Sequence, residues 1–244
     1  MGFIKVSRDH FHFVEGKTGA QFIPWGFNYD RDRNGRLLES YWNSEWTNVV
    51  ADFQEMKALG ANTVRIHLQV SRFLTGEKTL NRKSMAQLSK LIKLAEDTRL
   101  YIDITGLGCY ERAEVPAWYN DLSEYRRWAA QSVFWKNVAR CCSRSPAVFC
   151  YDLMNEPVFA DDPKNKDWTP GAFAGKYYVQ RITVDLRGRT PQAVGAEWVD
   201  KMAAAIRSDD KNILLQLEPF HGTWHFPVRS RIFIPQKLAG VSIS

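Results

Sequence analysis

The sequence predicts an α/β protein built on a parallel sheet, and three observations carry this prediction. Short, almost continuously apolar runs recur along the chain, and segments with helical spacing of apolar residues lie between them. The runs do not alternate between apolar and polar residues, as expected of strands buried on both faces. Because runs and helices alternate, the strands should be parallel and joined by right-handed crossovers. The length of 244 residues suits a single domain, 1–244, of this kind.

The chain begins with an alternating segment that turns at 16–19, which predicts an N-terminal β-hairpin at about 3–19. The apolar runs after it predict strands, which lie at 20–27, 62–70, 100–108, 147–154 and 212–220, with a sixth beginning at 239–244. Apolar spacing predicts helices over about 46–59, 85–95, 122–142 and 190–206. In the last of these, Thr190 is the expected cap and Pro191 the first helical residue.

The spacing of the strands suggests a (β/α)8 barrel that is incomplete. Each strand-helix unit takes about forty residues, so eight units need more chain than 244 residues. We therefore expect about six strands, with strands seven and eight missing and with open edges on the first and last strand. Open edges of this kind favour self-association.

Composition excludes several classes of function. The net charge of +6 comes from basic residues interleaved with acidic ones, which indicates a solvated surface and no nucleic-acid partner. No run approaches about 18 apolar residues, so we expect no membrane span, and the N-terminus shows no signal peptide. No dinucleotide fingerprint or phosphate-binding loop is present, so no cofactor is expected. The cysteines form no C-x-x-C pair, which favours free thiols and leans towards a cytoplasmic protein.

The stretch VFCYDLMNEPVF carries the clearest chemistry, because a buried strand runs directly into Asn155 and Glu156. In parallel α/β folds, sites form at the carboxyl ends of strands. A carboxyl group at the rim of an apolar cleft has a raised pKa and can donate a proton near neutral pH. Asn155 can donate a hydrogen bond to a ligand hydroxyl. The plainer alternative is that Glu156 only starts a helix or lies in a solvated loop.

Two polar residues on the second strand are further candidates. Arg65 alternates with Val64 and Ile66, so it should point into the barrel top, where it would hold a second carboxylate ionised or form a structural ion pair. His67 is either a ligand-binding residue or a satisfied core histidine. The segment HGTWH, at 221–225, has two histidines at metal-ligand spacing but no further clear ligand, so no metal site is expected. His10 and His12 are expected to be a surface pair.

Four segments in this order, FIPWGFNYD, GANTVRIHLQ, LYIDITGLGCY and VFCYDLMNEP, resemble glycoside hydrolase family 5, the cellulase and mannanase family. The resemblance covers nearly the whole chain. It implies a (β/α)8 barrel that hydrolyses a β-linked glucan- or mannan-type oligo- or polysaccharide with retention, by two carboxylates. It implies that Glu156 is the general acid/base.

The resemblance and the strand ends together give the expected substrate-binding residues. Those implied by the resemblance are Asn155, Arg65, Trp25, Asn28 and Tyr29. Loop position adds Tyr110 and Trp118 as residues that would stack on a sugar, and strand-end position adds His67 and Trp224.

The chain departs from the family pattern in two places. The usual histidine pattern of the third strand is replaced by TGLGCY, and no Asp or Glu follows Glu218. We therefore expect the nucleophile to be absent from the chain and its activity to be impaired, unless Glu218 serves, for example as an inverting partner of Glu156. The alternatives are a non-catalytic carbohydrate-binding protein, a truncated and inactive barrel, or a barrel enzyme of unrelated chemistry.

Overall fold

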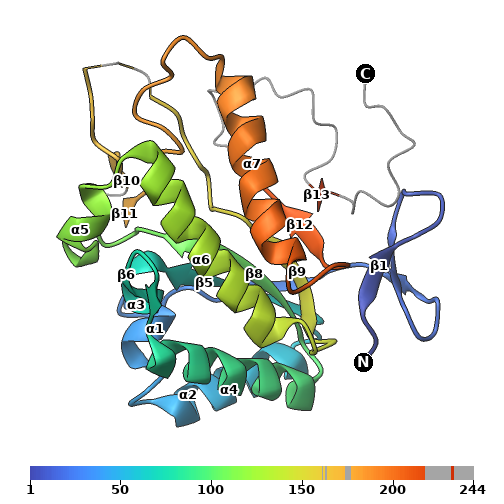
Figure 1. Ribbon diagram of the computed structural model, residues 1–244. Coiled ribbons are helices and arrows are strands. Elements are labelled where there is room, and N and C mark those ends of the chain that lie inside the picture. The colour runs from blue at the N-terminus through green and yellow to red at the C-terminus, as the bar shows by residue number, and fades with distance from the viewer. Residues whose placement is uncertain (161, 163, 174–176, 218–231, 234–244) are drawn as a thin grey trace.

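The computed structural model describes residues 1–160, 162, 164–173, 177–217 and 232–233. A central sheet is covered by long helices, and a small separate sheet lies at one end of it (Figure 1). The strands of the central sheet have the order β13-β12-β9-β8-β5-β4. Their bounds are β4 (Gly26–Asn28), β5 (Thr63–Gln69), β8 (Tyr101–Gly108), β9 (Val148–Asp152), β12 (Leu214–Gln216) and β13 (Ile232–Phe233).

Neighbouring strands from β4 to β12 pair in parallel, and β13 pairs with β12 antiparallel. Four of the five parallel strands fall within predicted runs and β4 extends one residue beyond its run, so the predicted parallel α/β architecture is confirmed. The antiparallel strand β13 was not predicted. The expected sixth strand, at 239–244, lies outside the described residues.

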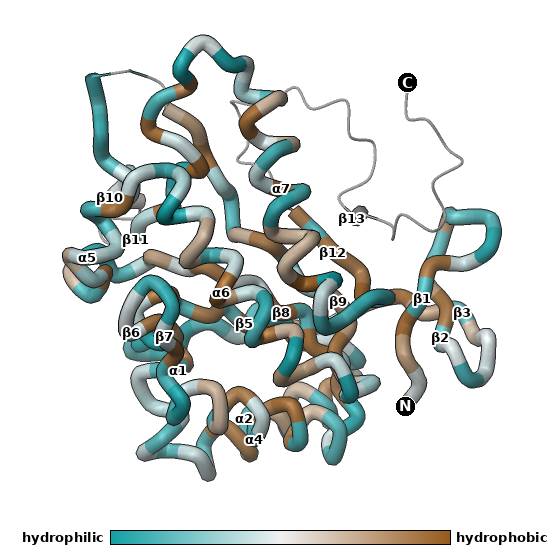
Figure 2. Tube along the Cα trace, viewed as in Figure 1, coloured by the Kyte–Doolittle hydropathy of each residue, from teal (hydrophilic) through white to brown (hydrophobic). Residues whose placement is uncertain are grey.

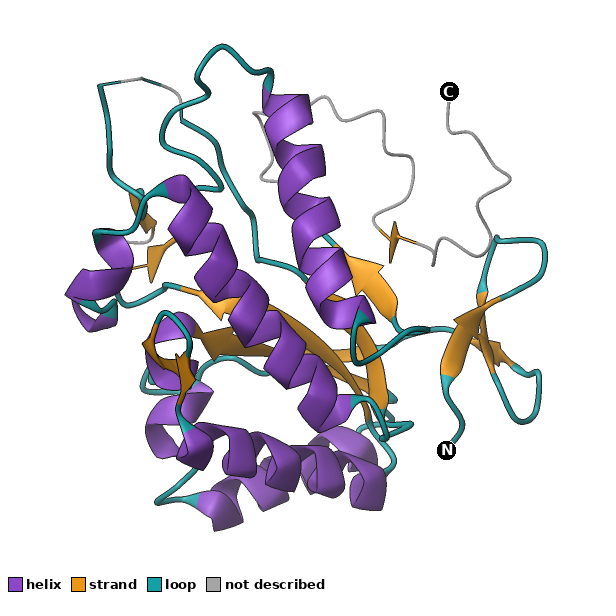
Figure 3. Ribbon diagram, viewed as in Figure 1, coloured by secondary structure: helices purple, strands orange, loops and turns teal. Residues whose placement is uncertain are grey.

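Helices follow the strands as the barrel pattern requires, and consecutive long helices pack against one another (Figure 3). The long helices are α2 (Trp46–Ala58), α4 (Arg82–Thr98), α6 (Glu124–Cys142) and α7 (Pro191–Arg207). Shorter helices are α1 (Leu38–Tyr41), α3 (Val70–Phe73), η1 (Arg112–Glu114) and α5 (Ala117–Asn120). The predicted cap of α7 is confirmed, because the Thr190 hydroxyl accepts a hydrogen bond from the Ala193 N–H at 3.1 Å. No helix of the described residues is both long and apolar enough to cross a membrane.

The core lies between the sheet and the helices, and hydrophobic residues concentrate along the strands (Figure 2). Gly106 of β8 shows how closely these layers approach. A Cβ atom at this position would lie 2.4 Å from the Trp135 ring of α6, so only glycine leaves room for the indole. Trp135 itself is fully buried and donates its indole N–H to the Leu153 carbonyl at 3.3 Å.

The N-terminal segment forms a three-stranded antiparallel sheet, β1 (Ile4–Val6), β2 (Phe13–Glu15) and β3 (Gln21–Phe22), in which the turn expected at 16–19 lies between β2 and β3. The sheet has one strand more than the expected hairpin. The run at 20–27 is divided between β3 and β4. Pro24 lies between these two strands, and a proline cannot donate to a ladder. The Phe22 ring packs edge-on against the rings of Tyr101 and Phe149, with ring centroids 4.8 Å and 5.5 Å apart. This sheet therefore covers the amino-terminal ends of β8 and β9.

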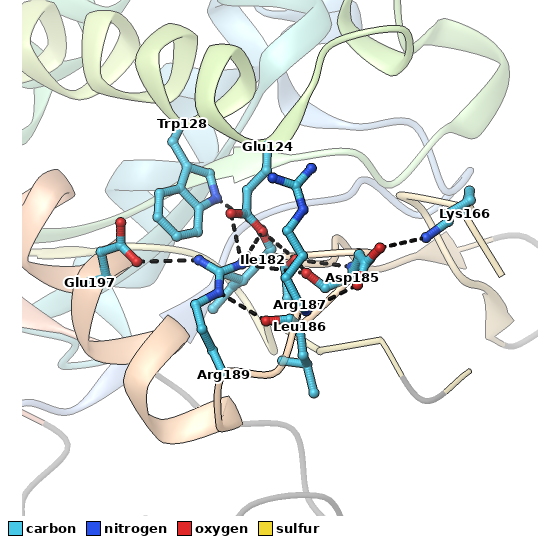
Figure 4. A network of polar contacts seen from close by, with 10 residues as sticks. Glu124, Trp128, Lys166, Ile182, Asp185, Leu186, Arg187, Arg189 and Glu197 are labelled. Atoms are coloured by element: carbon cyan, nitrogen blue, oxygen red, sulfur yellow. Dashed lines mark hydrogen bonds and ion pairs between the residues drawn. The ribbon is translucent and has the colours of Figure 1, made fainter. Parts of the chain in front are cut away.

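The connection between β9 and α7 is long and includes two short strands, β10 (Gly171–Phe173) and β11 (Tyr177–Tyr178). Another two-stranded sheet, β6 (Leu74–Gly76) and β7 (Thr79–Leu80), precedes α4. Figure 4 shows how part of the β9–α7 connection is attached to α6. The Arg189 guanidinium donates to both carboxylate oxygens of Glu124 of α6 at 2.9 Å. Within the connection itself, Lys166 donates to Asp185 at 3.0 Å.

Candidate active site

A cleft of about 310 Å³ opens at the carboxyl ends of the parallel strands. Asn28 ends β4, His67 lies near the end of β5, and Tyr110 follows β8. Asn155 and Glu156 follow β9. The residues that line the cleft are Asn28, Asp30, Arg31, His67, Tyr110, Asn155, Glu156, Tyr177, Tyr178 and Val179. Five of the residues predicted from the sequence are therefore brought together here.

Glu156 lies in a backbone conformation that few residues of its type adopt. Strand β9 ends at Asp152, and Glu156 has a φ of 44° and is half-buried. A left-handed backbone at a residue other than glycine costs roughly 1–2 kcal/mol and persists only when neighbouring contacts hold it. Leu153 donates to the Gln216 carbonyl at 2.9 Å on one side, and Val158 donates to the Gln180 carbonyl at 3.1 Å on the other. The turn is thus fixed at both ends, and it places Glu156 in the cleft wall.

Arg65 forms the centre of a polar cluster behind Glu156. Its Nη2 donates to Asp152 Oδ2 at 2.5 Å and to Asn155 Oδ1 at 3.1 Å, and its Nε donates to Thr105 Oγ1 at 2.7 Å. Thr105 in turn donates to the same oxygen of Asp152 at 2.9 Å. Because Arg65 donates to the side-chain carbonyl oxygen of Asn155, the side-chain N–H groups of Asn155 remain available to a ligand. Arg65 itself does not line the cleft.

His67 links two residues of the cleft wall. Its Nε2 lies 2.7 Å from Asn28 Oδ1, and its Nδ1 lies 2.5 Å from the Tyr110 hydroxyl. Burial lowers the pKa of His67 well below its usual range, and the charges of Arg65 and Arg31 lower it further. Burial raises the pKa of Tyr110 well above its usual range. At neutral pH the imidazole and the phenol are therefore both uncharged.

Arg31 forms a second wall of the cleft with two aromatic rings. Its guanidinium carbon lies 3.5 Å from the centroid of the Tyr177 ring and 5.3 Å from that of Tyr110. The same guanidinium pairs with Asp30 at 2.6 Å. This arrangement holds the flat guanidinium against the Tyr177 ring.

Besides Arg65, three residues predicted to bind the substrate do not line the cleft. The Tyr29 hydroxyl donates to Asp52 of α2 at 2.5 Å, so its side chain points to the helix layer. Trp25 precedes β4 and its carbonyl accepts from Thr63 at 3.2 Å, which places it at the opposite, amino-terminal end of the strands. Trp118 of α5 is half-buried and packs edge-on against Tyr119 at 5.6 Å. Strand-end position in the sequence does not specify which face of the sheet a side chain meets.

Two further expectations lie outside the described residues, namely Trp224 together with the HGTWH segment, and Glu218. His10 and His12 are on an N-terminal turn, where His12 lies 3.5 Å from Asp9. Within the described part of the chain, no group of three or more His, Cys, Asp or Glu residues is placed to hold a metal ion.

The residues around the cleft that sequence reasoning missed include Asp152, Arg31 and Tyr177. A signal for Asp152 was present, because a lone carboxylate in a strand buried on both faces needs a buried partner. Arg31 directly follows a strand-end carboxylate, but its stacking partner Tyr177 comes from the β9–α7 connection. No local pattern indicates that this connection returns to the cleft.

The family model for cellulase, glycosyl hydrolase family 5, matches residues 25–225. The chain belongs to glycosyl hydrolase family 5. No curated protein matches the chain. Solved structures with the same fold include a GH5_18 variant from Streptomyces cattleya in complex with Manβ1-4GlcNAc, with a TM-score of 0.62 and 17% identity, over 84% of this chain and 47% of that one.

Two further solved structures show the same fold. The endo-1,4-β-mannanase from Eisenia fetida matches with a TM-score of 0.60 and 17% identity, over 90% of this chain and 62% of that one. The exo-β-1,4-mannosidase Op5Man5 from Opitutaceae bacterium strain TAV5 matches with a TM-score of 0.59 and 16% identity, over 81% of this chain and 32% of that one. This family 5 chain therefore has the fold of part of a (β/α)8 barrel, of which the described residues form five parallel strands, and it spans 47% of the first of these structures.

Proposed function

We propose that this family 5 chain acts on a β-linked glucan- or mannan-type saccharide, with Glu156 as the general acid/base of a retaining hydrolysis. The observation that supports this most strongly is the position of Glu156 in the wall of a 310 Å³ cleft, beside Asn155 and at the carboxyl end of β9. In (β/α)8 barrels this end of the strands carries the chemistry.

In the first step of this mechanism, Glu156 donates its proton to the glycosidic oxygen while the bond from that oxygen to the anomeric carbon breaks and a second carboxylate forms an ester bond to the same carbon. In the second step, the Glu156 carboxylate takes a proton from a water molecule, whose oxygen attacks that carbon and displaces the second carboxylate. A fixed turn serves both steps, because the carboxyl group must reach the same glycosidic position as acid and then as base.

The second carboxylate of the mechanism is not assigned to a described residue. Asp30 lines the cleft but pairs with Arg31 at 2.6 Å, and Asp152 pairs with Arg65 at 2.5 Å. Both carboxylates thus have structural or binding roles in this proposal.

The chemistry of the cleft wall favours a neutral saccharide. Its charged groups Asp30 and Arg31 pair with each other, and its amides and phenols offer directional hydrogen bonds. Tyr177 and Tyr178 add aromatic surface suited to the apolar face of a sugar ring. The mannose-containing ligand of the Streptomyces cattleya structure and the mannan-directed names of the other two relatives support a mannan-type substrate over a glucan.

Hydrolysis of aryl β-mannosides and β-glucosides with different leaving groups tests this proposal. Glu156→Gln should lower kcat/KM for a para-nitrophenyl glycoside by roughly 100-fold or more, and should affect kcat/KM for a dinitrophenyl glycoside much less, because kcat/KM reports the first step and that leaving group needs no proton. Glu55→Gln, an exposed position on α2, is the matched control and should leave both rates unchanged. Sugar binding with no turnover on any of these substrates would contradict the enzymatic role and favour a carbohydrate-binding one.

A further inference from the structure

His67 lies behind the cleft wall, and two cleft residues depend on it. The side chain is 4% exposed, and each ring nitrogen contacts one cleft residue, Asn28 or Tyr110. A neutral imidazole has one donor nitrogen and one acceptor nitrogen. Its tautomer therefore decides the direction of both hydrogen bonds.

We propose that His67 is a positioning residue held as the neutral Nε2–H tautomer, so that the cleft presents Asn28 as a hydrogen-bond donor and Tyr110 as an acceptor. The inference rests on the proposed function for the identity of the ligand, a neutral sugar. The tautomer itself is independent of any ligand.

The atoms that face the imidazole support this tautomer. The atom of Asn28 nearest to Nε2, at 2.7 Å, is the carbonyl oxygen Oδ1, which only accepts hydrogen bonds. Nε2 must therefore donate, and Nδ1 is left with a lone pair. The Tyr110 hydroxyl, at 2.5 Å, must then donate to Nδ1. The opposite tautomer would set two lone pairs against each other at Asn28.

The charges around His67 disfavour the doubly protonated ring. Arg65 on the same strand and Arg31 after β4 both repel a positive imidazolium, and burial opposes it further. The other groups that contact the ring, Asn28 and Tyr110, are uncharged at neutral pH. His67 therefore stays neutral over the range in which an ordinary histidine titrates.

The backbone of Tyr110 is also held in place by hydrogen bonds. The Tyr110 N–H donates to Gln69 Oε1 at 3.1 Å, and the Gln69 N–H donates to Glu39 Oε1 at 2.6 Å. A Cβ atom at Gly108 would lie 2.4 Å from Gln69 Nε2, so the glutamine side chain fits tightly against the end of β8. The phenol is therefore held in place while its proton points to His67.

The consequence is a preference at one sugar position. With its carbonyl engaged by His67, Asn28 offers its N–H groups to the ligand, and with its proton engaged, Tyr110 offers oxygen lone pairs. A sugar hydroxyl can accept from the first and donate to the second. A deoxy sugar at this position would leave both groups without a partner, which costs far more than the loss of one contact between exposed groups.

Nitrogen NMR of the chain labelled with ¹⁵N-histidine tests the tautomer without any sugar. The His67 signals are those that disappear in His67→Gln. We expect a protonated Nε2 and an unprotonated Nδ1, with no change across the ordinary histidine pKa of about 6.5. A protonated Nδ1, or a titration near that value, would overturn the proposal.

Calorimetric titration with mannotetraose and cellotetraose tests the consequence. Tyr110→Phe and Asn28→Asp should each weaken binding by about 5- to 30-fold, and each effect should shrink in a His67→Gln background because the positioning is already lost. Additive effects would contradict the positioning role. If no variant and no wild-type chain binds either sugar, the proposed function fails while the NMR result still decides the tautomer.

Discussion

The guanidinium of Arg65 lies 2.5 Å from the carboxylate of Asp152, although 87 residues separate the two in the sequence. Arg65 belongs to β5 and Asp152 to β9, and β8 runs between these two strands. The pair therefore ties three strands together beneath Glu156, through Thr105 of β8. Asp152 is fully buried, so the pair has little contact with water.

The first prediction concerns this buried pair. Arg65→Met should lower the free energy of unfolding by about 3–5 kcal/mol, because it leaves the Asp152 carboxylate buried without its guanidinium. The double variant with Asp152→Leu should be less destabilised than the sum of the two single variants. Urea unfolding of the four proteins measures this coupling, and purely additive losses would show that the pair is not coupled.

The second prediction concerns the pH dependence of stability through Glu39. This carboxyl is 5% exposed, and burial raises its pKa to about 8. A raised folded-state pKa means that the folded state holds the proton more tightly than the unfolded one. The contribution of Glu39 to stability is thus full below the unfolded pKa of about 4.5 and is lost as the pH rises through about 8.

Glu39→Gln should remove this dependence while its carbonyl keeps the hydrogen bond from Gln69. We expect the variant to be more stable than the wild type at pH values near 8, by up to roughly 3–5 kcal/mol. Thermal unfolding followed from acidic to basic pH measures the difference. Glu55→Gln is the exposed control, and parallel pH profiles for Glu39→Gln and the wild type would contradict the prediction.

The third prediction concerns Arg127, which anchors the connection that carries Tyr177 and Val179. Arg127 of α6 is fully buried, and its Nε donates to Gln180 Oε1 at 2.9 Å. The Gln180 side chain also accepts from Tyr119 at 2.7 Å and donates to the Leu107 carbonyl at 2.8 Å. The Gln180 backbone carbonyl accepts from Val158, two residues after Glu156.

Arg127→Met should therefore weaken oligosaccharide binding although it lies outside the cleft. We expect a loss of about 10-fold in affinity together with a loss of about 2–4 kcal/mol in stability, because two buried hydrogen bonds are lost, from Arg127 to Gln180 Oε1 and to the Tyr119 carbonyl. Calorimetric titration and urea unfolding measure the two effects. Arg126→Met, the exposed neighbour on α6, serves as the control, and unchanged affinity in Arg127→Met would refute the link to the cleft.

The fourth prediction concerns the stack of Arg31 on Tyr177. Lysine keeps the charge but lacks the planar group that covers the ring. Arg31→Lys should weaken binding of mannotetraose by about 3- to 10-fold, and Arg31→Ala by more, because Asp30 then also loses its partner. Equal affinities for the wild type and both variants would show that this wall does not contact the sugar.

The five parallel strands, the long helices and the position of Glu156 at a strand end could be predicted because they depend on local sequence patterns. Apolar runs of the right length identify β5, β8 and β9, and the cap and proline at Thr190 and Pro191 identify the start of α7. The clustering of Asn28, His67 and Tyr110 with Glu156 also follows from local pattern, since the carboxyl ends of parallel strands lie at one edge.

Contacts over long sequence distances could not be predicted in the same way. Tyr29 was expected at the sugar, but its hydroxyl reaches Asp52 of α2, and the direction of that side chain depends on helix packing. Arg65 was expected to hold a carboxylate, and the structure brings to it Asp152, which lies 87 residues away in the sequence. Tyr177 reaches the cleft through a long connection whose path depends on Arg127 and Gln180.

The structure of Glu156→Gln with a bound mannotetraose tests the proposed role of this cleft most directly. We expect the sugar at the carboxyl ends of β4, β5, β8 and β9, with a glycosidic oxygen at about 3 Å from the side-chain amide of residue 156 and a ring hydroxyl on Asn155. A sugar bound elsewhere on the chain, or one in this cleft whose glycosidic oxygens all lie beyond hydrogen-bond reach of residue 156, would contradict the proposal.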